Sequence, residues 1–162
     1  MFSLKRILIS AAVVLFTAGI IYSVTPNEKA PEFELESVDG TVLKLADLKG
    51  KVVLLDFWAT WCPPCRAAVP DLVELQAEYG ENLVVVGISL DSDQTKKDVK
   101  PFMEQYGINY PVVWGTMNTA KDYGNIRAIP TSFIVDKEGN IVGKWVGMVE
   151  KKVYKETIDK LL

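Results

Sequence analysis

The hydrophobic pattern along the 162-residue chain changes its period several times, and each change marks an expected element. Residues 52–58 and 83–90 are almost continuous apolar runs, which is typical of strands that are covered on both faces of a sheet. Between them, residues 63–79 repeat apolar side chains at helical spacing, and Gly80 ends that repeat. This order predicts two parallel neighbouring strands that are joined by a crossover helix.

Shorter segments with strand or helix patterns surround this central unit. Two of them are pairs of strand-like segments about a polar, glycine-containing turn, which predicts β-hairpins. Pro101 lies either in the first turn of a helix capped by Asp98 or inside a longer helix that it kinks. Together the segments predict an α/β fold with a mixed central sheet and helices on both faces. The hairpins are expected at residues 33–45 and 131–146, a further strand at 111–114, and helices at 93–106, 116–123 and 150–162.

The beginning of the chain differs from the rest. Residues 7–24 carry no charge and follow two basic residues, Lys5 and Arg6. A membrane span needs about 20 apolar residues, and the small-residue cleavage site of a secretory signal is poorly matched here. The basic flank predicts a cytoplasmic N-terminus, a single pass through the cytoplasmic membrane, and a domain on the extracytoplasmic side. We therefore expect a membrane anchor at 1–25, with a cleaved signal peptide as the alternative, a linker at 26–31 and one domain at 32–162.

The residue types that the chain lacks exclude several chemistries. The chain has no histidine, which excludes Ser-His-Asp and Cys-His catalysis and metal sites that use imidazole. Its two cysteines are too few for a four-thiolate metal site, so we expect no metal and no other cofactor. The net charge of −3, without a basic patch, argues against a nucleic-acid partner, and we expect a monomer.

The two cysteines lie in the segment Trp61-Cys62-Pro63-Pro64-Cys65, between the first central strand and its helix. A Cys-x-x-Cys motif at such a junction is typical of a redox site. The helix N-terminus favours a thiolate at Cys62, and two intervening residues allow the sulfurs to form a reversible disulfide. The alternatives are a structural disulfide and half of a zinc site. A structural disulfide usually closes a longer loop, and the chain offers no further Cys or His as zinc ligands.

Residues 56–65, Asp-Phe-Trp-Ala-Thr-Trp-Cys-Pro-Pro-Cys, resemble the active-site segment of thioredoxins. The hairpin before them and an insert at about 92–115 are similar to the TlpA/ResA-like membrane-anchored thiol–disulfide oxidoreductases. The resemblance covers residues 30–162. It implies a thioredoxin-like fold with an N-terminal β-hairpin and a central insert, preceded by one transmembrane helix. It also implies that Cys62 is the nucleophile, that Cys65 resolves the mixed disulfide, and that the oxidised form contains a Cys62–Cys65 disulfide.

Ile129-Pro130-Thr131 matches the cis-proline loop of that family, which lies opposite the cysteine pair. The resemblance implies that the Ile129 backbone and Pro130 bind an extended substrate segment, with Trp61 flanking the site. The alternative is a proline that only starts a strand.

Asp56 is the one charged residue in an otherwise apolar central strand. Burial there would raise its pKa. The resemblance implies that Asp56 transfers a proton to and from Cys65. Many TlpA/ResA-like proteins have a Glu three residues after the second cysteine, but this chain has Ala68, so that role is not carried over. We therefore expect Asp56 to act alone, the alternative being an Asp at a strand end that faces solvent.

Pro63 and Pro64 have no N–H groups, so fewer donors can stabilise a Cys62 thiolate. A less stabilised thiolate predicts a reductant rather than a strong oxidant. The function expected is the reduction of disulfides in exported proteins, with electrons from a membrane donor, and the resemblance adds apocytochrome c as a substrate. Two alternatives stay open. One is a thiol peroxidase of the peroxiredoxin type, and the other is a non-catalytic chaperone or binding module.

Overall fold

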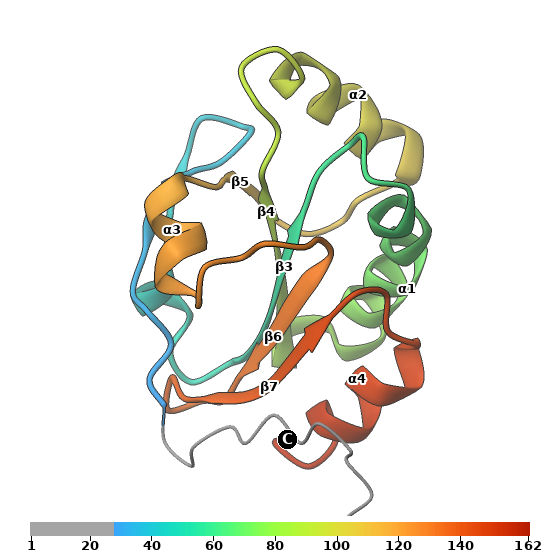
Figure 1. The fold of residues 1–162 in the computed structure, drawn as a ribbon. Coiled ribbons are helices and arrows are strands. Elements are labelled where there is room, and N and C mark those ends of the chain that lie inside the picture. The colour runs from blue at the N-terminus through green and yellow to red at the C-terminus, as the bar shows by residue number, and fades with distance from the viewer. Residues whose placement is uncertain (1–27) are drawn as a thin grey trace, which may run out of the picture.

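The computed structural model describes residues 28–162 and contains a five-stranded mixed sheet with helices on both faces (Figure 1). The strand order is β5-β4-β3-β6-β7. The strands β3, β4 and β5 are parallel, β6 is antiparallel to β3, and β7 is antiparallel to β6. The strands are β1 (Glu34–Glu36), β2 (Val42–Lys44), β3 (Val52–Trp58), β4 (Leu83–Ser89), β5 (Val112–Trp114), β6 (Thr131–Val135) and β7 (Ile141–Val146). The α-helices are α1 (Pro63–Tyr79), α2 (Lys96–Tyr106), α3 (Met117–Asp122) and α4 (Lys151–Ile158), and short 3-10 helices lie at Leu45–Leu48 and Gly80–Asn82.

The strand β3 is buried along its whole length because both faces of the sheet are covered. Val52 and Leu54 belong to a core that also contains side chains of α1, α2 and α4. Val53 and Leu55 belong to a second core, which the β1–β2 hairpin and the segment after α3 cover. Figure 1 shows α1 and α4 on one side of the sheet and α3 on the other. Successive side chains of β3 point to opposite faces of the sheet, so its continuous apolar run contributes to both cores.

The expected strand–helix–strand unit and both hairpins are confirmed. The helix expected from residue 93 begins at Lys96, because the chain first makes a turn in which the Thr95 and Lys96 N–H groups donate to the Ser92 carbonyl. Pro101 lies inside α2, so the longer of the two expected helices is the correct one. The last helix ends at Ile158 rather than at the end of the chain.

The membrane anchor or signal peptide expected at residues 1–25 lies outside the described residues. Among residues 28–162, no helix is long and apolar enough to cross a membrane. The expected linker at 26–31 is in part attached to the domain. The Ala30 N–H donates to the Gly139 carbonyl, and Ala30 is buried.

Candidate active site

The two cysteines lie where β3 ends and α1 begins. Residues 59–62 form a turn that is closed by a hydrogen bond from the Cys62 N–H to the Ala59 carbonyl (3.2 Å), and we call this segment the active-site turn. Cys62 is the N-cap of α1, and its Sγ accepts a hydrogen bond from the Cys65 N–H (3.3 Å). Pro63 and Pro64 occupy the first two helical positions, where the lack of N–H groups costs no intrahelical hydrogen bond. The Cys65 amide is therefore the first donor that the helix can offer to Cys62.

The sulfur atoms of Cys62 and Cys65 are joined in a disulfide, with a Cα–Cα distance of 5.3 Å. Cys62 is 3% exposed and Cys65 is 1% exposed. Cys62 is therefore more accessible than Cys65 only by a small margin in this oxidised form. The Ile129 carbonyl oxygen lies 3.6 Å from Cys62 Sγ and contributes to its burial.

The loop that carries Ile129 approaches the disulfide from the opposite side. The Ile129–Pro130 peptide bond is cis, as the resemblance implies, and Thr131 begins β6 directly after it. The Pro130 carbonyl accepts a hydrogen bond from the Gly147 N–H (2.8 Å), which attaches the loop to the end of β7. The structure thus brings Ile129 and Pro130 to the cysteine pair, 67 residues away in sequence from Cys62 to Ile129.

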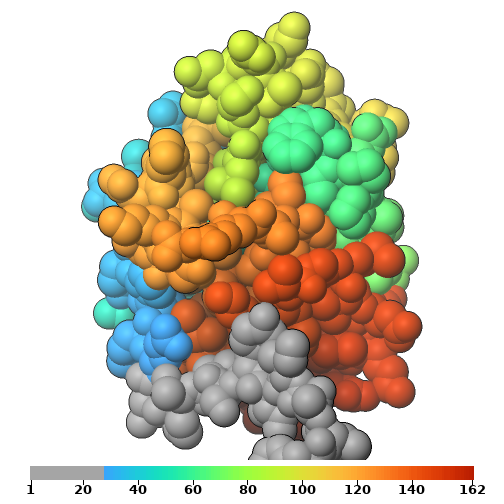
Figure 2. All heavy atoms as spheres, in the orientation of Figure 1, coloured from blue at the N-terminus to red at the C-terminus, as the bar shows by residue number. Residues whose placement is uncertain are grey.

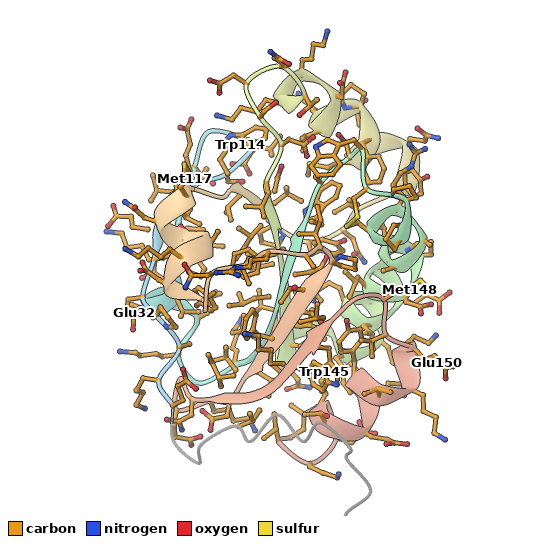
Figure 3. The ribbon with its side chains drawn as sticks, viewed as in Figure 1. Glu32, Trp114, Met117, Trp145, Met148 and Glu150 are labelled. Atoms are coloured by element: carbon orange, nitrogen blue, oxygen red, sulfur yellow. A yellow bond between two sulfur atoms is a disulfide. The ribbon has the colours of Figure 1, made fainter. Side chains whose placement is uncertain are left out.

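The tryptophans near the site differ in exposure. Trp61 is 59% exposed, whereas Trp58 is buried, and its Nε1 has no hydrogen-bond partner. Trp61 also lines a groove of about 350 Å³ between the start of α1 and α2. Trp145 takes no part in the site, since it lies between β7 and α4 and packs edge-on against Tyr154 (Figure 3). The groove beside Trp61 is lined by Thr60, Trp61, Arg66, Thr95, Asp98, Pro101, Phe102 and Gln105.

Asp56 is buried in the middle of β3, which is inconsistent with an Asp that faces solvent. Leu54 and Trp58, two positions before and after it on the same face, belong to the core that contains Cys65. Burial raises the pKa of the Asp56 carboxyl from 3.8 to about 7. A carboxyl with such a pKa can both accept and release a proton near neutral pH.

Three hydroxyl-bearing residues near Asp56 were not expected from the sequence. Ser132 is its partner in the register of β3 with β6, and the Ser132 and Tyr154 hydroxyls are hydrogen-bonded (2.7 Å). Burial and, to a lesser extent, the charge of Asp56 raise the pKa of Tyr110 and of Tyr154. These residues come from β6, the β5 side of the sheet and α4. The sequence offers a signal for one of them only. Ser132 lies two positions before the core residue Ile134, so a strand there places both side chains on the same face.

The arrangement suits thiol–disulfide exchange. It holds a Cys62–Cys65 disulfide at a helix N-terminus, a backbone loop next to one sulfur, and a buried carboxyl on the face of the sheet that the helix covers. Within residues 28–162, no group of three or more His, Cys, Asp or Glu side chains could hold a metal ion.

Comparisons with known proteins place this site in a family. The model of the AhpC/TSA family matches residues 26–144. The thioredoxin-like protein YneN of Bacillus subtilis is 37% identical over 134 residues, which cover 82% of this chain and 78% of YneN. The thiol-disulfide oxidoreductase ResA of Bacillus cereus is 37% identical over 135 residues, with 83% and 78% covered.

Solved structures agree with these relatives. The crystal structure of a putative thiol:disulfide interchange protein DsbE from Chlorobium tepidum has a TM-score of 0.76 and 34% identity, and the match covers 83% of this chain and 96% of that one. Together, the site geometry, the family match and the relatives lead to one assignment. The chain belongs to the AhpC/TSA family and is a thiol–disulfide oxidoreductase similar to ResA.

Proposed function

We propose that this oxidoreductase works as a reductant of disulfides in exported proteins, on the extracytoplasmic side of the cytoplasmic membrane. The direction of electron flow is inferred from the hydrogen-bond donors that surround Cys62 Sγ. The Cys65 N–H is its hydrogen-bond donor, while Pro63 and Pro64 supply none. Strong oxidants owe their potential to a stabilised reduced form, so weak stabilisation of the thiolate favours a reductant.

The location rests on the beginning of the sequence. The uncharged residues 7–24 follow Lys5 and Arg6, a pattern that favours a single-pass anchor with the domain outside. One structural relative, 35% identical with a TM-score of 0.70, is the pneumococcal exposed lipoprotein thioredoxin from Streptococcus pneumoniae. An extracytoplasmic site requires a membrane donor of reducing equivalents, because cytosolic reductants do not reach it.

The exchange proceeds in two steps. The Cys62 thiolate attacks one sulfur of the substrate disulfide, which forms a Cys62–substrate mixed disulfide and releases the other substrate sulfur as a thiolate. The Cys65 thiolate then attacks Cys62 Sγ, closes the Cys62–Cys65 disulfide and releases the second substrate thiolate. The protein loses two electrons and the substrate disulfide gains them. Two solvent protons complete the substrate thiols.

Cys65 is 1% exposed, so the proton that its thiol loses needs a nearby acceptor. We assign this role to Asp56, which lies on the face of β3 that α1 covers and whose pKa is about 7. The ionised carboxylate takes the Cys65 proton before the second step and returns it when the disulfide is reduced again. No other carboxyl group of the described residues is both on this face of β3 and as deeply buried.

The substrate class is a protein with a disulfide in an extended, accessible segment, because Ile129 presents its backbone next to Cys62. We include apocytochrome c, whose paired cysteines must be reduced before haem is attached. A short Cys-x-x-Cys-His segment fits binding by a backbone loop.

The test uses the full-length protein in two ways. In intact cells, a membrane-impermeant maleimide added after mild reduction should label the cysteines without lysis. Labelling only after lysis would overturn the extracytoplasmic location. In vitro, the reduced protein should reduce an oxidised Cys-x-x-Cys-His peptide, and Cys62→Ser should abolish this reaction. Turnover of hydrogen peroxide faster than that of the peptide disulfide would favour the peroxidase alternative, and a protective effect on unfolded proteins that survives Cys62→Ser would favour the chaperone alternative.

A further inference from the structure

A second buried carboxylate, Asp91, lies beside the active-site turn. Asp91 follows β4 by two residues and is 6% exposed. Its Oδ2 accepts hydrogen bonds from the Thr60 N–H (3.0 Å) and the Ser89 hydroxyl (3.0 Å), and its Oδ1 accepts one from the Thr60 hydroxyl (2.6 Å). No local sequence pattern indicates this contact, since residues 60 and 91 are 31 positions apart.

Thr60, a hydrogen-bond partner of Asp91, lies two residues before the nucleophile Cys62. Thr60 is the second residue of the active-site turn, and Cys62 is the last. A backbone hydrogen bond from the Leu90 N–H to the Trp58 carbonyl (2.7 Å) holds the two strand ends together just before this contact. In the space-filling view, the segments near residues 60 and 90 lie against each other on one face (Figure 2).

Both hydrogen-bond donors of Thr60, its backbone N–H and its hydroxyl, donate to the same carboxylate. Two bonds from one residue fix its position and its orientation, whereas a single bond would leave rotation free. Thr60 is 8% exposed and Ser89 1% exposed, so water competes little for these bonds. The backbone of the turn is therefore held from the side of β4.

We propose that Asp91 is a positioning residue for the exchange reaction. By holding Thr60, its carboxylate fixes the active-site turn so that Cys62 Sγ stays over the Cys65 N–H (3.3 Å). This positioning would act on the exchange chemistry itself, wherever the protein is located and in whichever direction electrons flow. A merely structural alternative is that Asp91 stabilises the fold and has no effect on Cys62.

Two variants of Asp91 separate geometry from charge. Asp91→Asn and Asp91→Ala remove the same charge. The Asn side chain can still accept from the Thr60 N–H and the Ser89 hydroxyl with its carbonyl oxygen, and its NH₂ can donate to the Thr60 hydroxyl. The Ala side chain makes none of these bonds. Any difference between the two variants thus reports the loss of positioning and not the loss of charge.

The experiment measures, on the reduced full-length protein, the pKa of the Cys62 thiol from the pH dependence of alkylation, and the rate of reduction of a peptide disulfide. Asp91→Ala should show a higher Cys62 pKa than Asp91→Asn, because a displaced Cys62 Sγ loses the hydrogen bond from the Cys65 N–H. Its rate should be about tenfold lower, because the displaced sulfur is also poorly oriented for attack on the substrate disulfide. Asp93→Ala, which removes an exposed carboxylate of the same loop, is the control and should match the wild type. Equal Cys62 pKa values and rates for the two Asp91 variants, whatever their stability, would overturn the proposal.

If Asp91→Ala does not fold, two variants of Thr60 distinguish the positioning role of Asp91 from a purely structural one. Thr60→Ser keeps both groups that donate to Asp91, and Thr60→Val keeps only the N–H. Thr60→Val should raise the Cys62 pKa and lower the rate severalfold relative to Thr60→Ser. Identical values for these two variants would again reduce Asp91 to a structural role.

Discussion

Burial of Asp56 makes the stability of this protein depend on pH in a direction that is unusual for a carboxyl group. The folded-state pKa of Asp56 is about 7, and its ordinary value is 3.8. Between these two pH values, the folded chain holds the Asp56 proton and the unfolded chain has lost it. Because the folded state binds more protons in this range, its stability falls as the pH rises. Below the range both states are protonated, and above it both are ionised, so Asp56 adds no further pH dependence there.

The size of the effect follows from the pKa difference. Each tenfold change in proton affinity corresponds to about 1.4 kcal/mol, so a change from 3.8 to about 7 corresponds to about 4 kcal/mol in the free energy of unfolding. About 3 kcal/mol of this falls between about pH 4.5 and pH 8, a range in which unfolding can be measured without strong acid. Asp56→Asn has nearly the same shape and does not titrate, so it lacks this contribution.

The assay is urea unfolding of the oxidised wild type and of oxidised Asp56→Asn at several pH values, followed by tryptophan fluorescence. The difference in unfolding free energy, variant minus wild type, should rise by about 3 kcal/mol from about pH 4.5 to pH 8. All other titrating groups are common to both proteins and cancel in this difference. A difference that stays constant over this range would refute the argument that Asp56 is buried with a raised pKa.

Three further substitutions test the roles of Cys65, Gly87 and Trp61. Cys65→Ser should accumulate a mixed disulfide between Cys62 and the substrate, visible on a non-reducing gel, since the resolving thiol is missing. Gly87→Ala should lower the unfolding free energy by about 1–3 kcal/mol, because the added Cβ would lie 2.9 Å from Nε1 of the buried Trp58. Trp61→Ala should raise KM for a protein disulfide severalfold and leave kcat for a small disulfide unchanged, because Trp61 is exposed beside the site. An unchanged KM would remove Trp61 from the substrate surface.

Much of the fold was predictable because its signals are local. The apolar run of β3 and the helical spacing of α1 have the same bounds in the structure as in the sequence pattern, Val52–Trp58 and Pro63–Tyr79. The donor from Cys65 to Cys62 was also predictable, since two prolines leave the third helical amide as the first one available. Each of these follows from residues within a single helix or strand.

The features that the sequence did not reveal are contacts between distant segments. The Thr60–Asp91 contact depends on how two neighbouring strands end, and no local pattern encodes that geometry. The Ser132–Tyr154 pair near Asp56 requires the packing of α4 on β6. The near-complete burial of Cys62 likewise depends on Ile129 of the cis-proline loop, whose carbonyl oxygen lies 3.6 Å from Cys62 Sγ.

The reduction potential of the Cys62–Cys65 pair is the decisive measurement, because it reports whether the disulfide is redox-active and in which direction it works. The protein would be equilibrated with a thiol buffer over a range of potentials, and the fraction of free thiols would be trapped by alkylation. We expect a value of about −230 to −270 mV, in the range of glutaredoxins and thioredoxin. A value near about −120 mV would make the protein a disulfide donor, and a disulfide that never equilibrates would make it a structural cross-link.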